Sequence, residues 1–323
     1  MPDLLEVNQL RVEFKTRHGN LRALDDVSFS IAQGEILGIV GESGAGKSLT
    51  GAAIVGLLEP PGRVTGGSIT YDGQRIDLLP DAAMRHLRGR QIGSIFQDPL
   101  TALDPLYTIG RQLVETIRTH LPLSEFDATQ RAVQLLEETG IQGAAQRLGQ
   151  YPHQFSGGMR QRVVIALALA AGPRLVIADE PTTALDVSVQ AQVIALLKRL
   201  CRQNGTAVML VTHDMGVIAE ACDRVAVMYA GRIVEIGPVR EVIQASAHPY
   251  TAGLMGSIPP MTGERERLMQ IDGAMPRLGS IPSGCAFHPR CPRAWDRCRS
   301  ERPELMPAGA TRAACWLHDA GPV

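Results

Sequence analysis

The residues with the clearest chemistry in this chain fit the phosphate-loop pattern G-x-x-x-x-G-K-[ST]. They are Gly41, Glu42, Ser43, Gly44, Ala45, Gly46, Lys47 and Ser48, and Leu49 follows them. Glycines allow consecutive backbone N–H groups to turn toward one anion. Lys47 can reach the β- and γ-phosphates of a nucleotide, and the Ser48 hydroxyl can ligate Mg²⁺. The pattern therefore predicts a site for a nucleoside triphosphate and magnesium.

Further along the chain, polar residues end three apolar stretches that read as buried strands. Gln97 can ligate Mg²⁺ or order the attacking water. Asp179 can hold Mg²⁺ through water, and Glu180 can polarise the water that attacks the γ-phosphate. His213 can donate a hydrogen bond to that phosphate. Each signal is weak alone, and together with the phosphate loop they predict hydrolysis.

A second anion-binding helix start is predicted at Ser156, Gly157, Gly158 and Met159. It offers a hydroxyl, two permissive backbones and a helix N-terminus. Taken alone, the motif is better explained as an ordinary N-cap followed by two flexible glycines.

Strands and helices must position these groups. The apolar residues 36–40 predict a strand before the phosphate loop, and 49–58 a helix after it. Residues 4–14 predict an edge strand and 21–31 its antiparallel partner, a hairpin beside the phosphate-loop strand. Phe14, with His18 behind it, is the candidate for stacking on adenine, although a core role for Phe14 is equally compatible with its type.

Residues 109–148 predict an amphipathic helical subdomain inserted into the nucleotide domain, with Ser124 as an N-cap. The 323 residues suffice for a nucleotide-binding domain and something smaller. A formal net charge of −1 gives no general attraction to nucleic acid or anionic membranes. With no secretory signal and no apolar run of transmembrane length, we expect a cytosolic chain whose membrane role comes through partners.

Four of the six cysteines, Cys285, Cys291, Cys298 and Cys315, crowd into the last 39 residues. In a cytosolic chain this favours metal binding over disulfides. Their spacing, C-x5-C-x6-C-x16-C, lacks the close pair that structural zinc sites carry, and four thiolates can also hold a [4Fe–4S] cluster. The spacing alone leaves both the cluster and Zn²⁺ open. Four nearby arginines would offset the negative charge of a thiolate-bound cluster: Arg290, Arg293, Arg297 and Arg299.

In this order, the motifs resemble the ATP-binding subunits of ABC transporters over residues 1–255, with Ala184-Leu185-Asp186 as one more family loop. Met159 departs from the commonest signature, which has Gln. Three segments and the cysteine tail resemble the ATPases of dipeptide and oligopeptide importers, a group that includes nickel and glutathione importers. These segments are 96–99, 158–162 and 248–251, and the tail begins at 285–292. The resemblance of the tail implies iron–sulfur members, so we expect the [4Fe–4S] cluster, with Zn²⁺ as the alternative.

The resemblance implies an α/β fold: a P-loop NTPase core of the ABC ATPase type with an antiparallel β subdomain, an inserted helical subdomain and a small cysteine-rich extension. The expected domains are 1–258, with the helical subdomain at about 98–172, and 259–323. The resemblance also implies a head-to-tail pair of ATPases, a second copy or a paralogue, in which Ser156 to Met159 contact the ATP of the partner. Two transmembrane permease subunits and an extracytoplasmic binding protein would complete a peptide importer, placing this peripheral ATP-driven translocase on the cytoplasmic face of the bacterial inner membrane.

Two other classes fit the sequence less well than the importer. A soluble ABC-type ATPase acting on DNA or ribosomes usually adds a second ATPase half, coiled coils or basic arms, and the sequence has none of these. A non-catalytic nucleotide sensor would not need Glu180 and His213. We therefore expect no nucleic-acid partner and an active ATPase.

Overall fold

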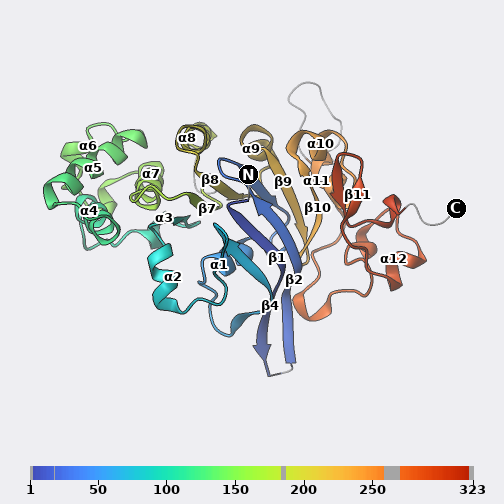
Figure 1. Cartoon of the computed structure of the whole chain (residues 1–323). Helices are drawn as coiled ribbons and strands as arrows, with labels where there is room; N and C mark the ends of the chain where they lie inside the picture. The colour runs from blue at the N-terminus through green and yellow to red at the C-terminus, as the bar shows by residue number, and fades with distance from the viewer. Residues whose placement is uncertain (1–2, 18, 183–186, 258–269, 320–323) are drawn as a thin grey trace. The chain divides into compact units, whose positions relative to one another are not determined.

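The computed structural model describes residues 3–17, 19–182, 187–257 and 270–319 (Figure 1). The chain divides into two compact units. The first comprises Met1–Leu4, Ile31–Ile36 and Leu78–Val211, and the second Leu5–Ser30, Leu37–Asp77 and Thr212–Val323. His18, the loop 184–186 and the expected domain boundary after residue 258 lie outside the described residues.

The first unit contains a parallel sheet of β6 (Ile92–Ile95), β7 (Leu175–Asp179) and β8 (Ala207–Val211). Ile92 lies opposite Leu175, and Leu175 lies opposite Ala207. β7 and β8 are almost wholly apolar and buried, as expected for parallel strands covered on both faces. Because the strands are parallel, the segments after β6 and β7 begin at the same edge of the sheet.

Helices make up the rest of the first unit. The predicted helical subdomain is three helices, α4 (Ile109–His120), α5 (Glu125–Glu138) and α6 (Ala144–Arg147), which lie together in Figure 1. Ser124 caps α5 as predicted, and its hydroxyl accepts the Asp127 N–H at 3.1 Å. The other helical segments are α2 (Asp81–Leu87), α3 (Pro99–Ala102), η1 (Pro152–Gln154), α7 (Gly157–Ala168) and α8 (Val187–Asn204).

The second unit contains an antiparallel sheet in the order β2-β1-β4-β5. Its strands are β1 (Leu5–Thr16), β2 (Gly19–Ile31), β4 (Gly62–Tyr71) and β5 (Gln74–Arg75). The prediction of an edge strand at 4–14 was wrong, because β1 pairs with β4 along its length. The hairpin also lies in a different sheet from the phosphate-loop strand.

The phosphate-loop strand β3 (Ile36–Val40) is buried at all five residues and pairs in parallel with β9 (Arg224–Tyr229). β10 (Arg232–Pro238) continues this sheet antiparallel to β9, followed by β12 (Thr311–Ala313) and β11 (Met306–Ala308). The C-terminal tail thus adds two strands to the sheet that carries β3.

Helical segments complete the second unit. They are α1 (Lys47–Ile54), α9 (Met215–Ala221), α10 (Val239–Gln244), α11 (Pro249–Gly256), η2 (Leu278–Ser280), η3 (His288–Arg290), α12 (Asp296–Ser300) and η4 (Trp316–His318). Over the described parts of both units, we find no helix with the length and apolar character needed to span a membrane.

Candidate functional site

The phosphate loop owes its shape to glycines with positive φ. Gly41, Gly44 and Gly46 have φ of 150°, 83° and 104°. A methyl group added at Gly41 would lie 2.3 Å from the Met228 carbonyl oxygen, and one at Gly46 would lie 2.7 Å from Leu24. The contact at Gly41 is with backbone, which cannot move aside, so the close approach of loop and neighbouring strand requires glycine there.

Lys47 begins helix α1 directly after the loop, so the loop lies at a helix N-terminus. The Lys47 side chain is buried, and its Nζ donates to the carbonyl oxygens of Gly41 at 2.8 Å and Glu42 at 3.1 Å. Ser48 is the next residue of the helix. The ammonium group and the N-terminal amides of α1 are therefore oriented toward the loop, as phosphate binding requires.

In the first unit, the structure brings together two of the predicted catalytic residues. Gln97 follows β6, and its Nε2 donates to Glu180 Oε2 at 3.2 Å. Glu180 follows Asp179, the last residue of β7. Glu180 has a φ of 46°, an uncommon value for a residue other than glycine. Such backbone conformations concentrate at functional sites.

The Ser-Gly-Gly helix start forms as predicted. The Ser156 hydroxyl accepts the Met159 N–H at 3.3 Å, and α7 begins at Gly157. Gly158 packs closely on Val189, because an added methyl group would lie 3.0 Å from its Cγ1. Gly157 has open space around its Cα. The N-terminus of α7 is thus capped and accessible at Gly157.

Two further predicted residues, His213 and Phe14, belong to the second unit. His213 is exposed between β8 and α9, whose first turn is capped by the Asp214 carboxylate. Phe14 lies on β1 opposite Gly62, and its half-buried ring contacts this glycine. Stacking of Phe14 on adenine stays a prediction.

The four tail cysteines line one small enclosed cavity of the second unit. Cys285 and Cys298 are adjacent, since the Cys285 N–H donates to the Cys298 carbonyl at 2.8 Å. All four are free thiols. Within the described ranges, however, no group of three or more His, Cys, Asp or Glu side chains is arranged to hold a metal ion.

Burial governs the electrostatics of these thiols. It raises the pKa of Cys285 to about 11, and it also raises the pKa of Cys291 and Cys315. Of the predicted neutralising arginines, Arg293 lines the cavity. The prediction was wrong for two others, because Arg290 bonds to Glu42, and Arg297 to Glu301 and Asp319.

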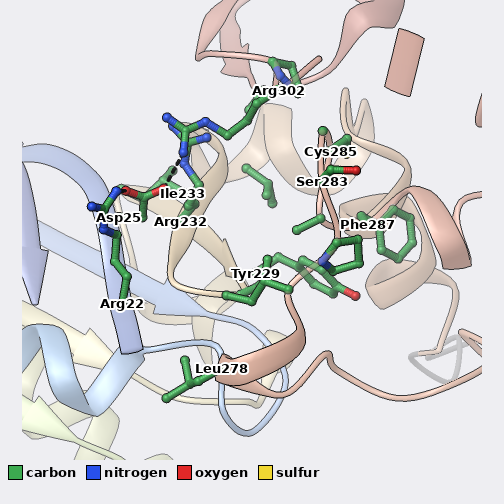
Figure 2. Close-up of a pocket in the computed structure, with 18 of the residues that line it drawn as sticks. Arg22, Asp25, Tyr229, Arg232, Ile233, Leu278, Ser283, Cys285, Phe287 and Arg302 are labelled. Atoms are coloured by element: carbon green, nitrogen blue, oxygen red, sulfur yellow. Dashed lines mark hydrogen bonds and ion pairs between the residues drawn. The ribbon is translucent and has the colours of Figure 1, made fainter. Parts of the chain in front are cut away.

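A larger cavity of about 550 Å³ lies between β2, the β9–β10 turn and the tail. In Figure 2, Arg302 of the tail and Asp25 of β2 are joined by an ion pair at this cavity, which Cys285 and Phe287 also line. None of the residues that line it belongs to the phosphate loop. It is therefore separate from the predicted triphosphate site.

Sequence reasoning missed two residues that touch the phosphate loop. The sequence placed Tyr250 in a segment that resembles the importer ATPases, and Arg290 among the arginines near the cysteines. It assigned neither residue a contact with the loop. The structure bonds both to Glu42. No local pattern could have found these contacts, because they join residues more than 200 positions apart.

Two family models match the chain. One, described as "ABC transporter", matches residues 24–183, and one described as "Oligopeptide/dipeptide transporter, C-terminal region" matches 234–298. Over 311 residues the chain is 48% identical to the oligopeptide transport ATP-binding protein OppD of Salmonella typhimurium, covering 96% of this chain and 92% of that protein. Over 321 residues it is 46% identical to the dipeptide transport ATP-binding protein DppD of Escherichia coli, covering 98% of each.

Solved structures agree with the expected fold. The dimeric ATP-binding cassette MJ0796, in a post-hydrolysis state bound to ADP and Pi, matches with a TM-score of 0.67 and 29% identity, over 73% of this chain and 99% of that one. CbiO1 from Clostridium perfringens, part of the transporter complex cbiONQ, matches with a TM-score of 0.65 and 28% identity, over 76% and 92%. The predicted α/β fold of the ABC ATPase type is confirmed.

Proposed function

The chain belongs to the family of ATP-binding subunits of oligopeptide and dipeptide ABC importers, and we propose how its residues perform that role. As a member, it hydrolyses ATP to drive peptide uptake. The alternative of a soluble ATPase acting on DNA or ribosomes is not favoured, because the relatives are named as transport proteins. The observation that carries the assignment is the phosphate loop, whose glycines and buried Lys47 have the geometry that a triphosphate needs.

In the proposed mechanism, the loop amides and Lys47 bind the β- and γ-phosphates. Ser48, Gln97 and Asp179 are assigned to Mg²⁺, which would neutralise charge on the phosphates. The remaining roles fall to Glu180 as general base, His213 as a donor to the γ-phosphate and Phe14 as the stacking partner of adenine. Support for the base comes from its hydrogen bond with Gln97, which holds the carboxylate at the end of β7.

Ser156, Gly157, Gly158 and Met159 are proposed to contact the ATP of a second ATPase subunit. Supporting this, α7 starts at a capped and accessible glycine, and the similar cassette MJ0796 is a dimer. Closure of such a dimer on ATP, and its opening after hydrolysis, would drive two transmembrane permease subunits supplied with peptide by a binding protein. The ATPase would then be peripheral to the membrane, on its cytoplasmic face.

Reconstitution tests this assembly. The full chain, combined with its candidate membrane subunits and mate ATPase in lipid vesicles, is expected to hydrolyse ATP faster when peptide-loaded binding protein is present. Lys47→Ala is the matched inactive control. Stimulation by DNA or ribosomes, with no response to peptide, would assign the chain to the alternative class.

We also propose a [4Fe–4S] cluster held by Cys285, Cys291, Cys298 and Cys315. Supporting this, the four cysteines line one small enclosed cavity, so their thiols lie on a common space. Burial disfavours their thiolates, so a bound cation would be needed to keep them ionised. The wide spacing of the four cysteines, which lacks the close pair of structural zinc sites, favours the larger cage of a cluster over Zn²⁺. When bound, the group would cross-link the tail.

Anaerobic purification tests the cluster. The protein is expected to be brown and to contain iron and acid-labile sulfide in equal amounts. Serine at any of the four tail cysteines should bleach it. Serine at Cys201 or Cys222, which are buried thiols outside the tail, should not. A colourless protein with one zinc per chain would establish the Zn²⁺ alternative.

A further inference from the structure

The C-terminal tail reaches the phosphate loop through one ion pair. The Arg290 guanidinium donates two hydrogen bonds to the Glu42 carboxylate, at 2.7 and 2.9 Å. The Arg290 side chain is only 7% exposed and that of Glu42 29%. Paired bonds between a guanidinium and a carboxylate fix orientation as well as distance. The second residue of the loop is therefore held by a residue of the cysteine-rich tail.

Arg290 is itself held in place. Its guanidinium also bonds, at 2.8 to 3.5 Å, to the carbonyl oxygens of Ile271, Asp272 and Gly273 and to the Tyr229 hydroxyl. The hydrogen bond to the Glu42 carboxylate is the main reason that the pKa of Arg290 is raised. A charged group fixed by this many partners is preorganised for its contact with the loop.

Glu42 is held by its backbone as well as by its carboxylate. Its N–H donates to the Tyr250 hydroxyl at 2.8 Å, and its carbonyl oxygen accepts from Lys47 Nζ at 3.1 Å. A displacement of Glu42 would therefore move a partner of Lys47, the cation of the loop. The position of Glu42 affects the group that the triphosphate contacts.

Apolar packing anchors the tail beside this pair. The Phe287 ring lies 5.3 Å from that of Tyr229 and 5.4 Å from that of Tyr250, between ring centroids. Phe287 is buried and stands three residues before Arg290. Aromatic pairs at these distances add stability beyond their buried area. The contact between tail and loop thus rests on a packed cluster.

We propose that Arg290 is a positioning residue for ATP binding: it fixes Glu42 in the phosphate loop and offsets the negative charge of this carboxylate near the triphosphate. The inference rests on the proposed function, in which the loop binds ATP. Its physical basis is that an unpaired carboxylate at the loop would repel the phosphates, and burial would strengthen that repulsion.

Equilibrium titration of the full-length subunit with ATP tests the proposal. Arg290→Met, which keeps the length of the side chain, is expected to raise the Kd about tenfold or more. The double variant Glu42→Gln/Arg290→Met should bind more tightly than Arg290→Met, because no unpaired carboxylate remains. A purely structural role would instead change the Kd and the thermal midpoint together, so the rescue counts only between variants whose thermal midpoints match. Arg290→Lys should fall between wild type and Arg290→Met, since lysine keeps the charge without the paired bonds.

The matched control is Arg302→Met, which removes another ion pair of the tail, to Asp25, away from the loop. Its Kd should stay within about twofold of wild type. Thermal midpoints and the reactivity of the tail thiols show whether each variant is folded. If Arg290→Met does not fold, the Kd of Arg290→Lys for ATP tests the proposal instead.

An unchanged Kd in a folded Arg290 variant, or an equal loss in Arg302→Met, would overturn the inference. Lys47→Ala distinguishes failure of the positioning role from failure of the proposed ATP-binding function. If it binds ATP as tightly as wild type, the proposed function itself fails, and the positioning role fails with it.

Discussion

Replacing Glu180 with Gln isolates the chemistry of the proposed base. Glutamine has nearly the shape of glutamate, and its amide oxygen can still accept the hydrogen bond that Gln97 donates at 3.2 Å. Both residue types pay a similar cost for the positive φ of 46° at this position. The fold and the nucleotide affinity should therefore be retained. What the substitution removes is the group that accepts a proton from the attacking water.

The expected fall in kcat follows from the loss of general-base catalysis alone. A positioned general base contributes about 10²- to 10⁴-fold to a rate. Since each tenfold corresponds to about 1.4 kcal/mol, the transition state should lose about 3–5 kcal/mol of stabilisation. We expect kcat for ATP hydrolysis by the assembled complex to fall by this factor, while the Kd for ATP changes less than about twofold.

The assay measures phosphate release and ATP binding on the same preparation. Glu180→Gln should accumulate an ATP-bound dimer, visible by size-exclusion chromatography. Gln97→Ala is the comparison that removes the donor and keeps the carboxylate, and its loss in kcat should be smaller. Turnover by Glu180→Gln within about threefold of wild type would refute the assignment of the base, because the variant lacks the group that is proposed to accept the proton.

The remaining predictions concern the loop and the helix start. Gly41→Ala should abolish ATP binding and destabilise the fold, because its methyl group would lie 2.3 Å from the Met228 carbonyl oxygen. The matched change Gly44→Ala meets no atom within 4 Å, so it should cost only about 1–2 kcal/mol for its positive φ in a denaturation experiment. Equal losses in the two variants would contradict the steric argument. Ser156→Arg should leave the ATP affinity of the isolated subunit unchanged but stop hydrolysis in the complex, and loss of binding by the lone subunit would exclude contact with the partner's ATP. Ser156→Ala should lower stability by about 0.5–2 kcal/mol through loss of the cap.

The elements that carry the nucleotide motifs could be predicted from the sequence because local pattern determines them. The predicted strand at 36–40 has the bounds of β3, and Ser124 and Ser156 cap helices as expected. Each signal is contained within a few residues, whether an apolar run, a cap or a turn glycine. The order of these local signals then identified the fold class.

Strand pairing was harder to predict from the sequence than the elements themselves. The residues of β1 alternate as an edge strand would, yet β4, some fifty residues later, covers its second side. The hairpin was expected beside β3, whose neighbour in the second unit is instead β9. Both errors arise because sheet order depends on partners distant in sequence, and alternation reports only which face is buried.

The partners of charged side chains in the tail were equally hard to predict from the sequence. From spacing alone, four arginines near four cysteines suggest neutralisation of a cluster, but a side chain as long as arginine can reach partners outside its own segment. Arg290 turns to the phosphate loop, while Arg297 bonds to two carboxylates and stacks on Trp316 with its guanidinium carbon 3.6 Å from the ring centroid.

The tail and the phosphate loop are parts of one folded unit, which changes how the cysteines should be understood. β12 of the tail pairs with β10, and the fully buried Glu235 of β10 accepts the N–H groups of Ala247 and His248 at 2.9 Å. A buried carboxylate is tolerated only when its hydrogen bonds are satisfied, so the segment before the tail is fixed as firmly as the strands. The tail residue Arg290 in turn fixes Glu42 through its two hydrogen bonds to the carboxylate. We therefore expect that a ligand bound by the four tail cysteines would also stabilise Arg290, the residue paired with Glu42, without any electron transfer.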